Sequence, residues 1–176
     1  ISDGVSESIN NIYVNGYEVY NCSGGGMYAS ESSPTLKNLI FENNTVSESG
    51  GGYFGYKSSP SLDQVTFRNN QARNGGGMAN QYKSSPTLTN VTFESNTALE
   101  NGGGLYNIDT CDVVLNQVIV RGNTASGNGG GIANEDKCSP SFTNVLISGN
   151  KGSNSAGGIF NADQTDLSLL NVTITG

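Results

Sequence analysis

Three aspartates recur at one position of a repeated segment and are the first candidates for chemistry. Asp109, Asp136 and Asp163 follow one another at intervals of 27 residues. If consecutive segments stack as parallel β-strands, the three carboxylates lie about 4.8 Å apart and repel one another by about 1 kcal/mol even in water. Either the side chains spread into solvent as an acidic face, or a cation lies among them. Calcium takes six to eight oxygen ligands, so the column is also a candidate calcium site.

The residues of several common active sites are missing. The chain contains no histidine, and paired carboxylates for acid–base hydrolysis would have to converge from different segments. A site like that of the polysaccharide lyases would need an arginine base beside an acidic calcium cluster. Of the arginines, Arg68 and Arg121 alternate with Glu42 and Glu94 in one column, which predicts ion pairs between neighbouring segments. We therefore expect no catalytic residues and no bound cofactor other than the candidate calcium ion.

Two cysteines share a position in adjacent segments. Cys111 and Cys138 are 27 residues apart, so stacking would put their α-carbons about 4.8 Å apart. That separation lies within the roughly 4.4–6.8 Å that a disulfide allows. We predict a Cys111–Cys138 disulfide, with two stacked free thiols as the alternative. Cys22 has no counterpart at this position and is predicted to be free or to pair outside this chain.

One sequence motif is repeated six times at intervals of about 26 or 27 residues, and the fold of this repeat must position all these side chains. Five copies begin with a glycine triplet, at 24–26, 50–52, 75–77, 102–104 and 129–131. The sixth copy begins with Ala156-Gly157-Gly158 instead. About 15 residues later comes an apolar residue: Phe41, Phe67, Phe93, Val120, Ile147 and Ile174. Repeats of this length are typical of solenoids, in which each unit buries its apolar face against its neighbours.

Each repeat predicts three short strands, one after the glycines, one around Leu88 and one around Phe93. Val91 and Phe93 alternate with Thr92, as in a strand, whereas the step from Leu88 to Val91 breaks that alternation and predicts a bend at Asn90. The glycine content and the many Thr, Val and Ile residues exclude α-helix. We therefore expect an all-β, right-handed parallel β-helix of about six to seven coils. Residues 1–176 form a single solenoid segment, which we interpret as part of a longer chain.

Side-chain amides recur in three further rows, which we predict to be internal amide ladders. The first row contains Asn11, Asn38, Gln64, Asn90, Gln117, Asn144 and Asn171. The second contains Asn44, Asn70, Asn96, Asn123 and Asn150, and the third Asn80, Asn107, Asn134 and Asn161. If the first row faces inward, the glycosylation motifs at Asn90 and Asn171 cannot carry a glycan.

Two surface features are candidates for binding a partner. The outward position before the phenylalanine row is apolar in many coils, which suggests contact with another subunit or domain. It reads Tyr13, Ile40, Thr66, Thr92, Ile119, Leu146 and Thr173. Tyr56 and Tyr82, each followed by a lysine, are placed in the register of the aspartate column. Such stacked tyrosines either bind a sugar or partner, or serve the fold alone.

The charge of the chain excludes two classes of partner. The net charge is −7 at pH 7, whereas phosphate binding requires a basic stripe and anionic membranes attract basic segments. No apolar run approaches the roughly 20 residues that span a bilayer. We expect neither nucleic-acid binding nor membrane insertion.

The repeats resemble those of a known family. The segment Phe41-Glu42-Asn43-Asn44 and its equivalents at 67–70 and 93–96 are similar to the FxxN motif of polymorphic outer-membrane protein repeats. Gly25-Gly26-Met27 and its equivalents at 103–105 and 130–132 resemble the companion glycine motif. The resemblance implies a secreted or surface-displayed β-helix, often with a role in adhesion. Our expectation is an extracellular or cell-surface scaffold, adhesin or appendage subunit without catalytic activity. The alternative is a polysaccharide lyase-like enzyme or a carbohydrate-binding module.

Overall fold

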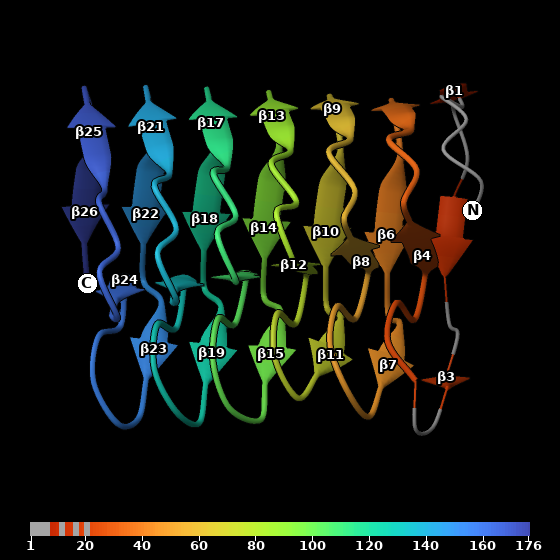
Figure 1. Ribbon diagram of the computed structural model, residues 1–176. Helices are drawn as coiled ribbons and strands as arrows, with labels where there is room; N and C mark the ends of the chain where they lie inside the picture. Colours follow the sequence, from red (N-terminus) through yellow and green to blue (C-terminus); the bar gives the residue numbers. More distant parts are fainter. Residues whose placement is uncertain (1–7, 11–12, 16–17, 20–21) are drawn as a thin grey trace.

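The computed structural model describes residues 8–10, 13–15, 18–19 and 22–176, with side chains from residue 22 onward. Its strands are stacked coil upon coil along one axis (Figure 1), and the described residues contain no helix. The predicted all-β parallel β-helix is confirmed, with every pairing parallel and each coil hydrogen-bonded to the next.

The strands form four parallel sheets. Sheet one contains β1 (Ser8–Asn10), β5 (Thr35–Lys37), β9 (Ser61–Asp63), β13 (Thr87–Thr89), β17 (Val114–Asn116), β21 (Ser141–Thr143) and β25 (Ser168–Leu170). Sheet two contains β2 (Tyr13–Asn15), β6 (Ile40–Glu42), β10 (Thr66–Arg68), β14 (Thr92–Glu94), β18 (Ile119–Arg121), β22 (Leu146–Ser148) and β26 (Thr173–Thr175). Sheet three contains β3 (Glu18–Val19), β7 (Thr45–Val46), β11 (Gln71–Ala72), β15 (Thr97–Ala98), β19 (Thr124–Ala125) and β23 (Lys151–Gly152). Sheet four contains β4 (Met27–Ser30), β8 (Tyr53–Tyr56), β12 (Met78–Gln81), β16 (Leu105–Ile108), β20 (Ile132–Asn134) and β24 (Ile159–Asn161).

The prediction of three strands per coil is therefore incomplete. Three sheets correspond to the predicted strands, but the two-residue strands of sheet three, such as β15 at Thr97–Ala98, were not expected. They follow directly after the second row of asparagines. Two residues are too few for an alternation that a sequence could reveal.

Apolar side chains fill the interior by stacking on their counterparts one coil away. The rings of Phe41, Phe67 and Phe93 lie parallel, with centroids 4.9 Å apart and planes 6° apart at both steps. Phe67 and Phe93 are completely buried. Gly77 lies beside this stack, at a position where only glycine fits. A Cβ there would lie 2.9 Å from Cδ1 of Phe93 and 2.6 Å from the carbonyl oxygen of Gly104. Any larger residue would have to push neighbouring backbone aside.

Two of the three predicted amide ladders are internal. In the second row each Nδ2 donates to Oδ1 of the next coil at 2.9–3.0 Å, from Asn44 to Asn150. In the third row the same bonds run from Asn80 to Asn161 at 2.7–2.8 Å. Gly55 stands where the preceding coil would supply another asparagine, and Oδ1 of Asn80 accordingly has no hydrogen-bond partner.

The first amide row lies on the surface, so the prediction that it is a ladder within the core is wrong. Asn38, Gln64 and Asn90 are exposed, and each adopts a left-handed backbone with φ of 53–55°. Their amides serve a sharp corner between sheets one and two, as the predicted bend required. The conclusion that Asn90 and Asn171 are closed to glycans is also wrong, because both side chains are exposed. Asn11 of this row lies outside the described residues.

Candidate functional site

The corner that leads from sheet four to sheet one changes along the molecule. In the earlier coils one residue there is left-handed, as at Lys57 with φ of 49°. From Tyr82 and Lys83 onward two consecutive residues are left-handed, with φ of 55° and 57° at this first pair. The strand register accounts for the difference, because Gln81 pairs with both Tyr56 and Ile108. The later coils therefore carry one additional residue at this corner.

The additional residue corrects the predicted alignment of the tyrosines. Tyr56 lies in the register of Gln81, whereas Tyr82 takes the register of Asp109, one residue beyond the pair of Gln81 and Ile108. The two tyrosine rings still meet, with centroids 5.1 Å apart and planes at 50°. Tyr82 is 47% exposed, so a large part of its ring faces solvent.

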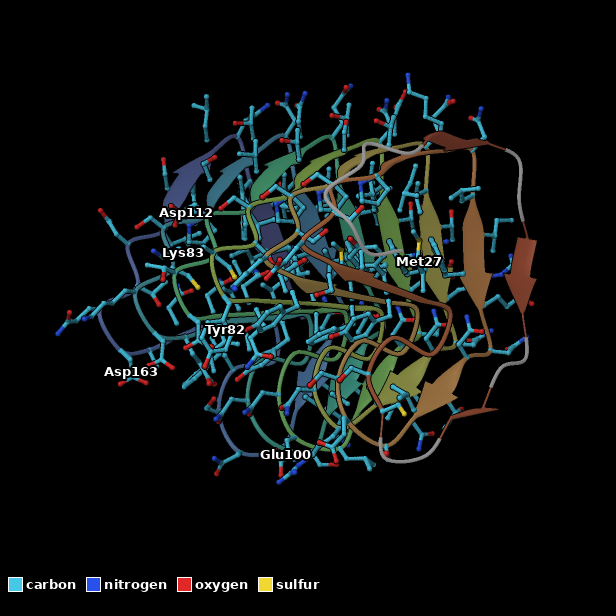
Figure 2. All side chains as sticks on the ribbon, turned by 45° about the vertical axis from the view of Figure 1, so that its right-hand side comes forward. Met27, Tyr82, Lys83, Glu100, Asp112 and Asp163 are labelled. Carbon is cyan, nitrogen blue, oxygen red and sulfur yellow. The ribbon has the colours of Figure 1, made fainter. Side chains whose placement is uncertain are left out.

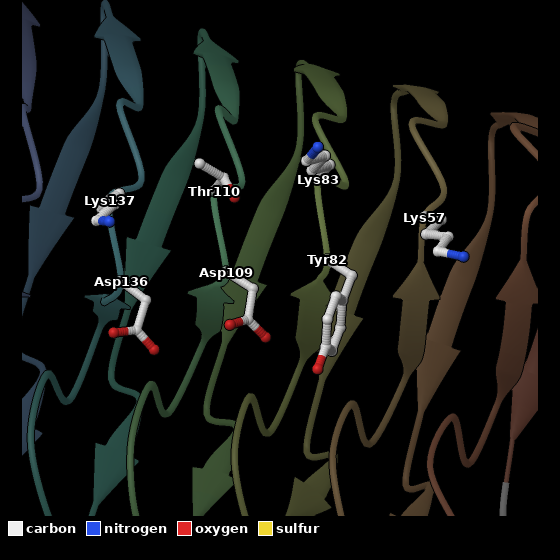
Figure 3. A pocket seen from close by; sticks show the side chains of 7 residues that line it. All are labelled: Lys57, Tyr82, Lys83, Asp109, Thr110, Asp136 and Lys137. Atoms are coloured by element: carbon white, nitrogen blue, oxygen red, sulfur yellow. The ribbon is translucent and has the colours of Figure 1, made fainter.

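A shallow groove of about 680 Å³ runs along this corner. It is lined by Lys57, Tyr82, Lys83, Asp109, Thr110, Asp136 and Lys137. Figure 3 shows these side chains in two rows, with Tyr82, Asp109 and Asp136 in one and the three lysines with Thr110 in the other. The groove thus presents cations, carboxylates and one aromatic ring side by side.

The lysines of the groove differ in their partners. Nζ of Lys57 lies 2.9 Å from Oε1 of Glu31 in the preceding coil, and the hydrogen bond to that carboxylate raises the pKa of Lys57. Lys83 and Lys137 form no salt bridge with any residue in the described part of the chain. Their ammonium groups are available to a ligand that enters the groove.

The predicted calcium site at Asp109, Asp136 and Asp163 is not supported by the arrangement of the carboxylates. Asp136 and Asp163 are exposed, and Figure 2 shows Asp163 at the periphery of the molecule. Asp109 and Asp136 line the groove, but Asp163 does not. Among residues 22–176, no three Asp, Glu or Cys side chains are grouped so that they could hold a metal ion. Asp136 and Asp163 are exposed, as the alternative of an acidic face expects, whereas Asp109 is half-buried.

The predicted disulfide is absent, because Cys111 and Cys138 are both free thiols and completely buried. The backbone N–H of Cys111 donates to Sγ of Cys138 at 3.1 Å. Each thiol also turns back to a carbonyl of its own corner, at 2.9 Å from Ile108 O for Cys111 and 3.0 Å from Glu135 O for Cys138. The hydrogen bond with Cys138 and burial both raise the pKa of the Cys111 thiol.

A column of hydroxyl groups explains why the two cysteines lie there. In the preceding coil Ser84 donates its hydroxyl to Gln81 O at 2.7 Å, and in the following coil Thr165 donates to Ala162 O at 2.6 Å. The backbone N–H of Ser58 donates to Oγ of Ser84 at 3.0 Å, as that of Cys111 does to Cys138. The thiols therefore occupy positions in a ladder of small polar side chains. Cys22 is free and exposed.

All three arginines form ion pairs between coils. The predicted column is confirmed, because Arg68 contacts Glu42 and Arg121 lies 3.0 Å from Glu94. A second column was not predicted: Arg73 lies 2.9 Å from Glu100 and 3.8 Å from a carboxylate oxygen of Glu48. These three residues each lie two positions before a glycine triplet, a signal that could have revealed the column. None of the arginines lines the groove.

The outward stripe of sheet two is partly accessible. Ile119 is 36% exposed and Leu146 38% exposed, while Ile40, Thr66 and Thr92 are half-buried. The backbone of Tyr13 pairs with Ile40 in this sheet, but its side chain lies outside the described residues.

Comparisons with known proteins identify the fold and its hand. The family model described as a right handed beta helix region matches residues 3–176. Neither the comparison with curated proteins nor that with solved structures gives a match. In the described part of the chain no helix is long and apolar enough to cross a membrane.

Proposed function

The chain belongs to the right-handed β-helix family, and on that premise we propose that it is an extracellular or cell-surface structural protein. Its role is that of a scaffold, adhesin or appendage subunit without catalytic activity of its own. The resemblance of its FxxN and glycine motifs to polymorphic outer-membrane protein repeats supports this location.

The observation that carries the proposal is how the recurrent polar residues are used. The buried asparagines bond to their counterparts in the next coil, and all three arginines pair with glutamates of neighbouring coils. The arginines, one of which a polysaccharide lyase would use as its base, are thus engaged in holding the coils together. The positions that change from coil to coil, in the corner groove and on the outward stripe, are those that a partner would recognise.

The outward stripe is the surface we assign to another subunit or domain. Ile119 and Leu146 lie next to each other in adjacent strands of sheet two, and contiguous apolar surface of this kind is what a partner covers. Changing Leu146 to lysine should reduce the size of the native assembly, measured by light scattering. A lysine at Val114, which is 41% exposed on sheet one, is the matched control. An assembly unchanged by L146K would contradict the assignment.

The corner groove favours carbohydrate binding as the second candidate function. Tyr82 presents an exposed ring beside the ammonium groups of Lys83 and Lys137, a combination suited to the face and the substituents of a sugar. We propose that the groove would bind such a sugar as a carbohydrate-binding module does, through the Tyr82 ring and the charged groups beside it.

Surface labelling tests the proposed location. Intact source cells are treated with a membrane-impermeant amine reagent, and the chain is then recovered with a specific antiserum. The proposal expects labelled chain from intact cells or from their medium. Chain that becomes labelled only after lysis would overturn it.

A further inference from the structure

We propose that Asn128 is a site of spontaneous deamidation, at which the side-chain amide is converted through a cyclic imide into a carboxylate. Asn128 lies on the loop that leads from β19 to β20 (Figure 1). The same dipeptide occurs in other coils, and the fold makes this copy reactive while it protects the others. The inference goes beyond the proposed function and does not depend on it.

The reactive dipeptide is Asn-Gly, which occurs at 15–16, 74–75, 101–102 and 128–129. Asparagine is among the chemically labile residues. In this dipeptide the backbone nitrogen of the glycine attacks the side-chain carbonyl carbon of the asparagine, and glycine obstructs that approach least because it has no Cβ. By sequence alone, all four copies are therefore candidates. Gly16 of the first copy lies outside the described residues.

The three described copies share their local conformation. Gly75, Gly102 and Gly129 have φ of 61–66°, and the asparagine that precedes each of them is half-buried. Neither the glycine φ nor the burial of the asparagine therefore separates one copy from another.

The hydrogen bond of the glycine N–H does separate them. The N–H of Gly75 donates to the carbonyl of Asn101 at 2.9 Å, and that of Gly102 donates to the carbonyl of Asn128 at 3.0 Å. The N–H of Gly129 forms no hydrogen bond with any residue that the structure describes. The first two nitrogens are thus held against the following coil, whereas the nitrogen of Gly129 is free to turn towards the side chain of Asn128.

The missing bond has a cause in the following coil. Gly130 donates to the carbonyl of Ala156 at 3.0 Å, so the acceptor for Gly129 would be the carbonyl of Ser155. Ala156 replaces the first glycine of the triplet and does not adopt the positive φ of the glycines at this position. A residue with a Cβ disfavours that conformation. The turn therefore differs in this coil, and Gly129 is left without its acceptor.

The side-chain carbonyl of Asn128 is polarised for attack. Its Oδ1 accepts the hydroxyl of Ser155 at 2.8 Å and Nδ2 of Asn154 at 3.1 Å. The attack places negative charge on this oxygen, and hydrogen-bond donors directed at it stabilise that charge. Asn128 also lines a surface groove of about 500 Å³, through which water reaches the site.

The reaction consumes one water molecule and needs no oxidant or reductant. The nitrogen of Gly129 forms a bond to Cγ of Asn128 and gives up its proton, and the bond from Cγ to Nδ2 breaks as ammonia leaves with that proton. Water then opens the imide ring. Hydrolysis of the new bond gives aspartate at position 128, and hydrolysis of the original peptide bond gives isoaspartate. Either product adds one negative charge to the loop.

Peptide mapping of the whole chain by mass spectrometry, after incubation at pH 8, tests the proposal. Deamidation at Asn128 should be at least tenfold faster than at Asn74 or Asn101. In the chain unfolded by urea the three sites should react at similar rates. Equal rates in the folded chain would overturn the proposal, as would a difference that persists in the unfolded chain. So would an Asn128 that stays intact in the folded chain while the unfolded chain reacts.

Substitutions of exposed serines test the assisting hydroxyl. S155A should slow deamidation at Asn128 several-fold, because it removes the donor at 2.8 Å. S155T keeps a hydroxyl and should retain the wild-type rate. Ser153 lines the same groove, and S153A should leave the rate unchanged. If S155A reacted as fast as S153A, the role assigned to the Ser155 hydroxyl would be overturned.

Discussion

Oδ1 of Asn96 accepts two hydrogen bonds from Asn70, one coil away: the backbone N–H donates at 3.0 Å and the side-chain Nδ2 also at 3.0 Å. Both residues are buried. The side chain of Asn96 in turn donates to Asn123 and to the carbonyl of Phe67, each at 2.9 Å. The polar groups of each corner are therefore hydrogen-bonded to the following coil, and contacts between coils stabilise the fold.

Asn96→Ala should be strongly destabilising. The change removes the acceptor of the Asn70 backbone N–H and the side-chain donor to the carbonyl of Phe67. It also breaks the ladder bonds to Asn70 and Asn123, although Nδ2 of Asn70 keeps the carbonyl of Phe41 and Oδ1 of Asn123 keeps the backbone N–H of residue 96. Each unsatisfied buried group costs about 1–3 kcal/mol, so we expect a loss of about 3–5 kcal/mol in the free energy of unfolding, measured by urea denaturation. Asn90→Gly is the control, since Asn90 is exposed with φ of 54° and glycine adopts this conformation freely. If the two variants lost similar amounts of unfolding free energy, the stabilising role assigned to the asparagine ladder would be contradicted.

Phe67→Ala should open the centre of the phenylalanine stack. The ring is completely buried between Phe41 and Phe93, and removing it should cost about 3–5 kcal/mol. Phe67→Ile should cost less, because Ile147 occupies the same row in a later coil. Thermal unfolding of the two variants measures the difference. Equal melting temperatures for the isoleucine and alanine variants would contradict the claim that packing within this row stabilises the fold.

The thiols should react in two stages. Cys22 is exposed, whereas Cys111 and Cys138 are completely buried, so the native chain should take up one equivalent of a maleimide. Unfolding in guanidinium without reductant should expose the two buried thiols, so that the total uptake rises to three equivalents of maleimide. A total of one equivalent under those conditions would mean that Cys111 and Cys138 are bridged.

Glu135 should make stability depend on pH. Burial, and after it the neighbouring Asp136, Asp163 and Glu100, raises the pKa of Glu135 above its ordinary value of 4.5, while the hydrogen bond from Tyr106 opposes the shift. A raised carboxyl pKa means that the folded state binds the proton more tightly than the unfolded state does. Its ionised form is therefore unfavourable at neutral pH, and that cost disappears as the pH falls through the raised pKa towards 4.5.

Glu135→Gln checks this effect. Glutamine keeps an oxygen that accepts from the Tyr106 hydroxyl but carries no charge. The variant should melt at a higher temperature than the wild-type chain at pH 7, and the difference should shrink towards pH 4. A variant that is less stable than wild type at pH 7 would show that the charge of Glu135 is favourable in the fold.

Periodicity made most of the fold predictable, because a solenoid repeats its side-chain environments. The positions of Leu88, Val91 and Phe93 were assigned to the interior from their spacing, and all three are completely buried. The asparagine rows were harder to place. A buried ladder and an exposed left-handed corner both select amides, for different reasons. The exposed row also accepts Gln64 and Gln117, whereas the two buried rows contain asparagine alone, and this restriction could have distinguished them.

The binding surfaces were less predictable, because they depend on departures from the repeat. One additional residue at Tyr82 shifts the corner and brings the lysines and aspartates into one groove. The additional residue forms no contiguous motif. The cysteine prediction failed because a shared register gives the α-carbon spacing of a disulfide but not the direction of the thiols, which turn to carbonyls of their own corners.

The central claim, a structural β-helix without catalytic activity, is tested most directly by incubating the purified chain with acidic polysaccharides. Polygalacturonate, alginate and hyaluronan are the substrates, with and without millimolar calcium, and the readouts are reducing ends, absorbance of unsaturated products and viscosity. The account predicts no change in any readout beyond that of a heat-denatured control. Depolymerisation of any of the three that follows the concentration of the folded chain would contradict it.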